Sequence, residues 1–178
     1  MALKRSAEFD AAVKFLIEEI EGNETVDTGG HTMYGISKKA YPNEDIANMT
    51  KARAEEIYLR DYWNALHLDD LPLPAVLKEC IFSIGVNSGV GKAEALVRRA
   101  YNLVRTDADK IATPDGSGAL WPMLKGFLKR KSTYANSFGG AFVTVWGMHY
   151  EKLVQDKTYH PYRRGWFARL YTTMRRGV

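Results

Sequence analysis

Apolar residues recur with a helical period over most of the chain. Near the N-terminus they fall at intervals of three and four, which predicts an amphipathic helix with one buried stripe. The residues of this stripe are Phe9, Val13, Leu16, Ile17 and Ile20. Gly22 follows directly and is expected to end the helix.

The segment from residue 24 to residue 37 breaks this pattern. It is rich in Gly, Thr and β-forming residues and has no helical period, which predicts a short β-ribbon or ordered loop. Thr50 then has the position of an N-cap for a second helix that continues to Tyr62. Further helical patterns cover residues 76–84, 96–104, 120–131 and 136–155, and a short one begins at Trp166. The fold class is therefore predicted to be mainly α, with a small β element after the first helix.

Composition narrows the class of protein. The chain has 178 residues, of which 46% are hydrophobic and 12% aromatic, enough to build the core of one domain. No run approaches the roughly 18 apolar residues that a membrane-spanning helix needs. The N-terminal segment has no continuous apolar stretch, so we expect no signal peptide. The single cysteine, Cys80, excludes an intramolecular disulfide and is expected to be buried.

Charge is divided unevenly along the sequence. Residues 1–91 carry 9 basic and 15 acidic side chains, whereas residues 92–178 carry 16 basic and 6 acidic ones. From Lys157 onward there are six basic residues, no acid and five aromatics. This distribution predicts contact with a polyanion, which by charge alone can be a nucleic acid, an anionic membrane or an anionic cell wall.

Most catalytic constellations lack support in this sequence. No serine lies in a nucleophile-elbow context, the four histidines fit no metal-ligand spacing, and no Gly-rich phosphate loop occurs. We therefore expect neither a metal nor an organic cofactor. The remaining candidates are the acids around the end of the first helix, namely Glu18, Glu19, Glu21, Glu24 and Asp27.

Helical geometry separates these acids. Glu18 lies opposite the apolar stripe, whereas Glu21 lies at its edge beside Ile17 and directly before Gly22. The negative end of the helix dipole and partial desolvation there favour a protonated carboxyl, which a glycosidase needs in order to protonate its leaving group. Asp27 is a candidate for the second, ionised carboxylate, and Thr32 for a hydroxyl that holds a water. The alternative is a solvated helix end without chemistry, and spacing alone favours that alternative.

The sequence motifs in this segment favour a catalytic role for these acids over a solvated helix end. Glu21-Gly22 is followed by a motif that resembles the signature of glycoside hydrolase family 108, the N-acetylmuramidase endolysin family of bacteriophages. The matching residues are Asp27, Gly29, Gly30, Thr32, Gly35, Ile36 and Ser37. Residues 57–63, 86–89, 114–118 and 165–169 are also similar to later parts of that family, so the resemblance spans nearly the whole chain.

This resemblance implies a lysozyme-like helical domain and the hydrolysis of peptidoglycan. It implies cleavage of the β-1,4 bond between N-acetylmuramic acid and N-acetylglucosamine, with Glu21 as the proton donor and Asp27 and Thr32 beside it. The segment between the Glu and the Asp is shorter here than in the family, and a gapless count back from Asp27 would select Glu18 instead. We prefer Glu21, because Gly22 follows it and because Glu18 faces away from the buried stripe.

Further expectations concern the substrate site and the division of the chain. Tyr34, Tyr58, Tyr62 and Trp63 are candidates to line a sugar cleft, although core packing is the expected role for at least half of them. Asn87 is expected either to cap its helix or to bind a substrate N-acetyl group. Residues 1–91 are predicted to form a catalytic lobe. Residues 92–178 are predicted to form a basic helical part that binds peptidoglycan, packed into the same single domain.

The resemblance also implies a cellular setting. We expect a monomer that is made in the cytoplasm of an infected host and reaches the wall after release by a holin-type membrane protein. Its expected partners are bacterial peptidoglycan and, through the basic half, the anionic envelope, with no nucleic acid. The alternatives are a non-catalytic wall-binding or secretion-associated protein of the same fold, and a nucleic-acid-binding protein that uses the basic half.

Overall fold

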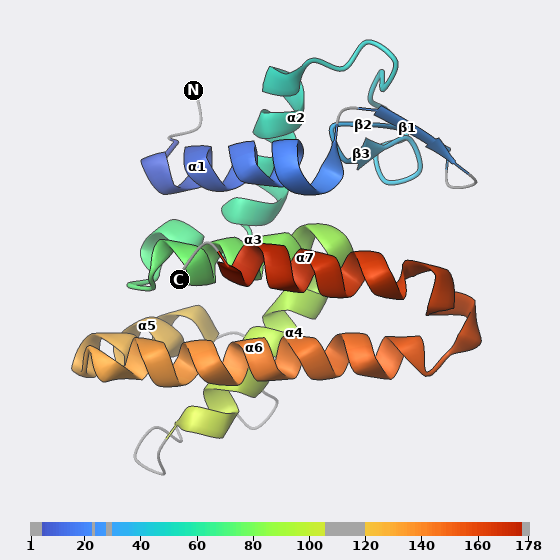
Figure 1. Cartoon of the computed structure of the whole chain (residues 1–178). Coiled ribbons are helices and arrows are strands. Elements are labelled where there is room, and N and C mark those ends of the chain that lie inside the picture. The colour runs from blue at the N-terminus through green and yellow to red at the C-terminus, as the bar shows by residue number, and fades with distance from the viewer. Residues whose placement is uncertain (1–4, 23, 28–29, 106–119, 176–178) are drawn as a thin grey trace. The chain divides into compact units, whose positions relative to one another are not determined.

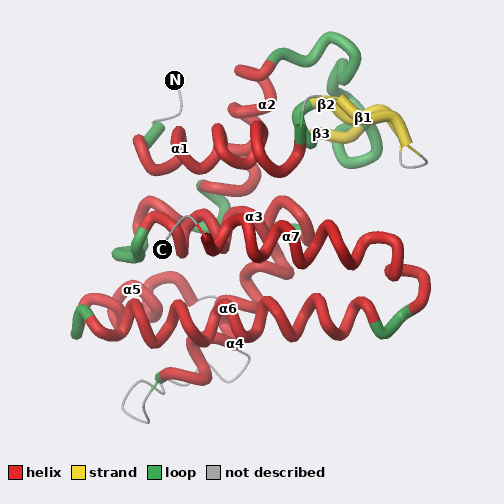
Figure 2. The backbone as a smooth tube through the Cα atoms, viewed as in Figure 1, coloured by secondary structure: helices red, strands yellow, loops and turns green. Residues whose placement is uncertain are grey.

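The computed structural model describes residues 5–22, 24–27, 30–105 and 120–175. These residues form seven α-helices, several short π- and 3₁₀-helical turns and one three-stranded sheet (Figures 1 and 2). The predicted fold class, mainly α with a small β-ribbon after the first helix, is confirmed. None of the helices within these ranges is long and apolar enough to cross a membrane.

The chain forms two compact units, Met1–Ala65 and Leu66–Val178. This division falls at residue 65, and not at residue 91 as expected from the charge distribution and the motifs. The reason is the packing of helix α3 (Ala75–Ser88), which lies against α4 (Val90–Val104), α6 (Thr133–Val154) and α7 (Arg163–Arg175). A helix with such neighbours belongs to the second unit.

The first unit begins with helix α1 (Ala7–Phe15), which continues into a π-helical turn, η1 (Leu16–Glu21). Ser6 caps α1, because its hydroxyl accepts a hydrogen bond of 3.1 Å from the amide of Phe9. The predicted apolar stripe is buried at Phe9, Val13, Leu16 and Ile17, and Ile20 is half-buried. The expected amphipathic helix is confirmed.

The small sheet follows at the C-terminal end of this helix (Figure 1). Strands β1 (Glu24–Asp27), β2 (Gly30–Met33) and β3 (Ile36–Ser37) are antiparallel, in the order β1-β2-β3. Met33 pairs with Ile36, so β2 and β3 are joined by the two residues Tyr34 and Gly35. Both have positive φ, 51° and 79°, which is the backbone of a type I′ hairpin turn.

Helix α2 (Lys51–Tyr58) supplies the other side of this unit's core. Thr50 caps it as predicted, with its hydroxyl accepting a hydrogen bond of 3.2 Å from the Arg53 amide. A second π-helical turn, η2 (Leu59–Trp63), extends it, and Trp63 is fully buried against Phe9 with ring centroids 5.5 Å apart. These edge-to-face aromatic rings join α1 to the end of η2.

The second unit is helical throughout its described residues. After η3 (Leu68–Asp70) and α3, Gly89 adopts φ 89° and separates α3 from α4. Helix α5 (Leu120–Arg130) and the long α6 follow, and α6 packs on α4, α5 and α7. A 3₁₀ segment, η5 (Lys157–Tyr162), leads into α7, which runs beside α6 (Figure 1).

Most of the predicted helices in this unit match the structure. The terminal helix begins at Arg163, three residues before the expected start at Trp166. Cys80 is buried as expected, and burial raises the pKa of its thiol to about 12. The segment at residues 114–118, which resembles a later part of the family, lies outside the described residues.

Gly35 has a conformation that other residues adopt only at a cost, so we expect Gly35→Ala to destabilise the protein. A Cβ at this position would approach Cγ of Glu21 to 2.7 Å and would also overlap the hydroxyl of Tyr58. With the positive φ, the free energy of unfolding should fall by about 1–3 kcal/mol in urea titrations.

A matched control for this substitution is Gly126→Ala on α5, where nothing lies within 4 Å of the added Cβ. Because alanine is the better helix former, this control should raise the free energy of unfolding by about 0.5–1 kcal/mol. Equal stability of Gly35→Ala and the wild type would contradict the described turn.

Candidate active site

Glu21 is the last residue of the π-helical turn that ends the first helix. The amide of Gly22 donates a hydrogen bond of 2.9 Å to the carbonyl of Ile17, five residues back, instead of the usual four. Gly22 then leaves the helix with φ 73°, a backbone conformation that glycine adopts without strain. The Glu21 side chain is half-buried at this end. Such π-helical turns are frequent at functional sites.

The Glu21 side chain packs against the Tyr34–Gly35 turn. Gly35 lies so close to Glu21 that a Cβ there would come within 3.0 Å of both Cβ and Cγ of Glu21. The hydroxyl of Tyr58 reaches the same place, and it donates a hydrogen bond of 2.9 Å to the carbonyl of Tyr34. Glu21, the turn and the buried Tyr58 therefore meet at one point of the first unit.

Glu18 has a different environment. Its side chain is exposed and forms an ion pair of 2.9 Å with the ammonium of Lys51. The hydrogen bond from Lys51 lowers the pKa of Glu18 below its usual value. A carboxylate that is held ionised in solvent is poorly suited to donate a proton at neutral pH.

Asp27 and Thr32 lie farther along the hairpin. Thr32 is half-buried in the central strand, where it pairs with Thr25 on one side and Ser37 on the other. Asp27 ends β1 opposite Gly30, and the structure describes its place in the strand alone. Its backbone is three residues along the hairpin from the Glu24–Met33 pair, a distance of about 10 Å. The structure thus does not bring the backbone of Asp27 to Glu21, and the roles of Asp27 and Thr32 stay predictions.

The aromatic candidates divide between surface and core. Tyr34 is half-buried in the turn beside Glu21. Tyr62 is also half-buried, and its ring lies 5.8 Å from that of Tyr58. Trp63 is fully buried, so it has no exposed ring face on which a sugar could stack. Trp63 is therefore a core residue, which corrects the expectation that it lines a cleft.

Asn87 belongs to the second unit, where it lies within the last turn of α3 and is not the residue that caps this helix. Its side-chain carbonyl accepts a hydrogen bond of 2.9 Å from the hydroxyl of the fully buried Tyr150. This bond links the end of α3 to α6. A role of Asn87 toward a substrate stays a prediction.

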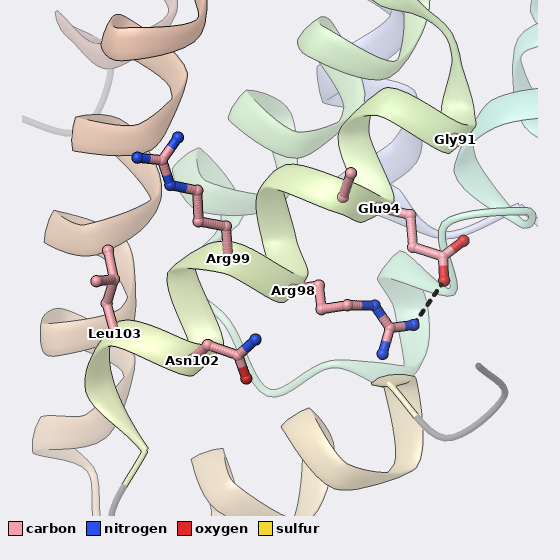
Figure 3. Close-up of a pocket in the computed structure, with 7 residues that line it drawn as sticks. Gly91, Glu94, Arg98, Arg99, Asn102 and Leu103 are labelled. Atoms are coloured by element: carbon pink, nitrogen blue, oxygen red, sulfur yellow. Dashed lines mark hydrogen bonds and ion pairs between the residues drawn. The ribbon is translucent and has the colours of Figure 1, made fainter. Parts of the chain in front are cut away.

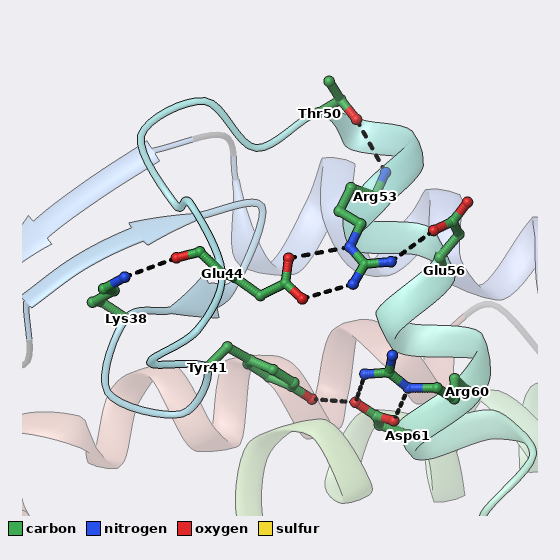
Figure 4. A network of polar contacts seen from close by, with 8 residues as sticks. All are labelled: Lys38, Tyr41, Glu44, Thr50, Arg53, Glu56, Arg60 and Asp61. Atoms are coloured by element: carbon green, nitrogen blue, oxygen red, sulfur yellow. Dashed lines mark hydrogen bonds and ion pairs between the residues drawn. The ribbon is translucent and has the colours of Figure 1, made fainter.

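A network of polar contacts holds the loop between β3 and α2, as Figure 4 shows. Arg53 donates hydrogen bonds of 3.1 and 2.7 Å to the two carboxylate oxygens of Glu44, and it also pairs with Glu56 at 2.9 Å. Lower in the same view, the hydroxyl of Tyr41 donates to Asp61 at 3.1 Å. These contacts fix the loop on α2.

The hydrogen bonds of this network determine which of its side chains are ionised. Hydrogen bonding to Arg60 lowers the pKa of Asp61, so Asp61 is an ionised acceptor. Burial and a hydrogen bond to Tyr62 raise the pKa of Tyr41, which keeps its hydroxyl protonated as a donor. Asp61 is therefore an anion and Tyr41 is neutral, as the hydrogen bond between them requires. The network is a structural feature of the loop.

A surface hollow of about 490 Å³ lies along α4 in the second unit (Figure 3). Arg98, Arg99 and Asn102 line it together with Glu94. Glu94 is the one carboxylate among its described lining residues, and it pairs with Arg98 at 3.2 Å. The hollow thus lacks the two carboxyl groups that glycoside hydrolysis uses.

A metal site is a separate question. The described residues nowhere bring together three His, Cys, Asp or Glu side chains that could hold a metal ion.

Sequence reasoning missed the part that Tyr58 and Gly35 play around Glu21. Gly35 lies beside both Glu21 and Tyr58, which are far from it in the sequence. A sequence signal for the turn does exist, since an aromatic-Gly pair separates Met33 from Ile36. Tyr is uncommon at a positive φ, so this signal is weak.

The described residues thus define a mainly helical protein in which a carboxyl at the end of the first helix packs on a β-turn. Residues 17–89 match the family model Glycosyl hydrolase 108. This range begins within η1 and ends at Gly89, so it contains every candidate site residue named above. The match supports a glycosyl hydrolase 108 domain over this stretch.

The fold resembles that of a solved structure, SagA from Brucella abortus, with a TM-score of 0.67. The two chains are 22% identical, and the alignment covers 94% of this chain and 92% of the other. At this identity the likeness establishes the fold alone. None of the curated proteins compared with this chain matches it.

Proposed function

We propose that this protein is a peptidoglycan hydrolase that cleaves the β-1,4 bond between N-acetylmuramic acid and N-acetylglucosamine. The observation that carries this proposal is the contrast between two neighbouring acids. Glu21 is half-buried against the Tyr34–Gly35 turn, whereas Glu18 is exposed and paired with Lys51. Of the two, Glu21 is the one that is partly sheltered from solvent and packed against a second element, so it is the better candidate for a positioned general acid.

In this reaction the carboxyl of Glu21 donates its proton to the glycosidic oxygen as the bond to the anomeric carbon breaks. The positive charge that develops on the sugar ring is stabilised by a second carboxylate, for which Asp27 is the candidate. Water then adds to the anomeric carbon, with Thr32 as the hydroxyl that orients it. The separation of the two carboxyl groups decides whether the product keeps or inverts its configuration.

We assign the protein to host-cell lysis, as the endolysin resemblance implies. It would be made in the host cytoplasm, reach the wall through a holin-type membrane protein and act there as a monomer. The competing function is that of a wall-binding or secretion-associated protein without activity. Clearing of a turbid wall suspension by the purified protein would exclude that alternative.

The second unit offers a surface for the anionic envelope. On α7, Arg164, Phe167, Tyr171 and Arg175 are exposed and recur at intervals of three and four, so they share one face of the helix. The rings of Phe167 and Tyr171 are 41% and 66% exposed. Arginine and aromatic side chains together suit an anionic surface, and no acid occurs after Asp156.

The first test is Glu21→Gln, which keeps the shape of the side chain but removes the proton that it donates. Lysis of wall preparations should fall by a factor of about 10²–10⁴, the usual contribution of general acid catalysis, with little change in melting temperature. Glu18→Gln is the control, since it loses only an exposed ion pair and should lyse walls normally. The reverse result would make Glu18 the acid.

The second test concerns the hairpin. Asp27→Asn and Thr32→Ala should each reduce lysis while the protein remains folded by circular dichroism, because both are assigned to the reaction. Thr25→Ala removes a threonine from the same strand pair as Thr32 and should keep its activity. A variant that unfolds, or one that lyses walls at the wild-type rate, would lose its catalytic assignment.

The third test separates attraction to the envelope from bond cleavage. Replacing the exposed Arg163, Arg164 and Arg175 with Gln should weaken wall binding and lysis at low salt. The difference should fade as the screening length falls to about 8 Å at physiological salt. Hydrolysis of a short soluble peptidoglycan fragment should hardly change.

A control for this third test makes the same change in net charge at other exposed positions, Lys14, Lys39 and Lys129. If both variants lose wall binding equally, net charge alone is responsible. If the α7 variant has the same salt curve as the wild type, α7 does not contact the envelope.

A further inference from the structure

Tyr58 is a fully buried side chain with a polar end. A hydroxyl in the core needs a hydrogen-bond partner, and that of Tyr58 donates to the carbonyl of Tyr34 at 2.9 Å. The ring anchors this hydroxyl firmly, because Tyr58 lies on α2 and packs against Tyr62 at 5.8 Å between ring centroids. The bond therefore ties a turn of the sheet to a rigid helix.

The turn that receives this bond is strained. Tyr34 has φ 51°, a left-handed conformation that non-glycine residues other than Asn and Asp adopt rarely. A type I′ turn requires positive φ at both central residues, and tyrosine is poorly suited to the first of them. An external hydrogen bond to the Tyr34 carbonyl is thus a means of holding this conformation in place.

Glu21 is the next link. The space beside the Cα of Gly35 is filled by the Tyr58 hydroxyl and by Cβ and Cγ of Glu21. Cγ of Glu21 and the Tyr58 oxygen consequently lie within about 5 Å of each other. A movement of the turn away from Glu21 would therefore leave space beside its side chain, into which the carboxyl could turn.

We propose that Tyr58 is a positioning residue that holds the carboxyl of Glu21 in its catalytic orientation by fixing the Tyr34–Gly35 turn. This inference rests on the proposed function, since it gives Tyr58 a part in the reaction assigned to Glu21. Tyr58 itself is fully buried and acts only through the turn and Glu21.

The test is Tyr58→Phe, assayed on a short soluble peptidoglycan fragment so that wall binding does not enter. We expect kcat to fall about 10- to 100-fold, because a small misplacement of a catalytic group is costly, while KM changes less than about twofold.

Tyr41→Phe is the matched control. It also removes a tyrosine hydroxyl from the first unit, together with the hydrogen bond of 3.1 Å that this hydroxyl donates to Asp61. It should lower the melting temperature to a similar extent but leave kcat and KM as in the wild type. If Tyr58→Phe and Tyr41→Phe behave alike in the assay, the hydroxyl of Tyr58 has only a structural role and the proposal fails.

A rescue experiment tests whether the effect of Tyr58→Phe on kcat passes through the turn. It remains informative if Tyr58→Phe folds poorly. Tyr34→Asn places a residue that favours the first position of a type I′ turn, so the turn should depend less on the hydrogen bond. Tyr58→Phe should therefore cost at least several-fold less in kcat in the Tyr34→Asn background than in the wild type. Equal costs in the two backgrounds would overturn the proposal, because they would show that the turn does not transmit the effect.

The failure of the two proposals would look different. If the wild-type protein does not cleave the fragment, the proposed function is wrong irrespective of Tyr58. If Glu21→Gln retains activity on the fragment, Glu21 is not the acid, and the positioning role of Tyr58 fails with that assignment. If Glu21→Gln is inactive and Tyr58→Phe is not impaired, the function stands and Tyr58 has no positioning role.

Discussion

The contact between the Tyr34–Gly35 turn and the end of the first helix is the constraint on which the candidate site depends. Three segments that are distant in sequence meet there: the π-helical turn with Glu21, the sheet, and helix α2 with Tyr58. The left-handed conformation of Tyr34 costs about 1–2 kcal/mol. A hydrogen bond contributes about 0.5–1.5 kcal/mol net, which is of the same size. The free-energy cost of the Tyr34 conformation and the gain from the hydrogen bond are therefore nearly equal. The turn thus depends on its tertiary contacts.

The remainder of the first unit supports this contact. Phe9 and Trp63 join the start of α1 to the end of η2, so the two helices that carry Glu21 and Tyr58 are held at both ends. The Arg53–Glu44 pair and the Tyr41–Asp61 bond hold the loop between the sheet and α2. In the second unit, α3, α4, α6 and α7 pack on one another. The exposed basic and aromatic face of α7 is this unit's candidate surface for binding the envelope.

Much of the fold could be predicted from the sequence, because it follows from local rules. The stripe from Phe9 to Ile17 and the Thr50 cap depend on residues within a few positions of each other, and the structure confirms them. The environment of Glu21 could not be derived in this way. It depends on Gly35 and on Tyr58, which are 14 and 37 residues away, and on a π-helical turn that an ideal helical wheel does not represent. Trp63 was misassigned for a related reason, since an aromatic residue at a helix end can face either a cleft or the core.

The antiparallel register of the hairpin has a consequence for how this site can vary between related proteins. Glu21 is fixed where the hairpin starts, whereas Asp27 ends its first strand, at the opposite end of the paired region. Adding or removing two residues on each strand would keep every remaining pair and the face of the strand on which position 27 lies, and it would shift that position by about 7 Å. The hairpin is thus a spacer whose length can change in two-residue steps while the helix end that holds Glu21 stays unchanged.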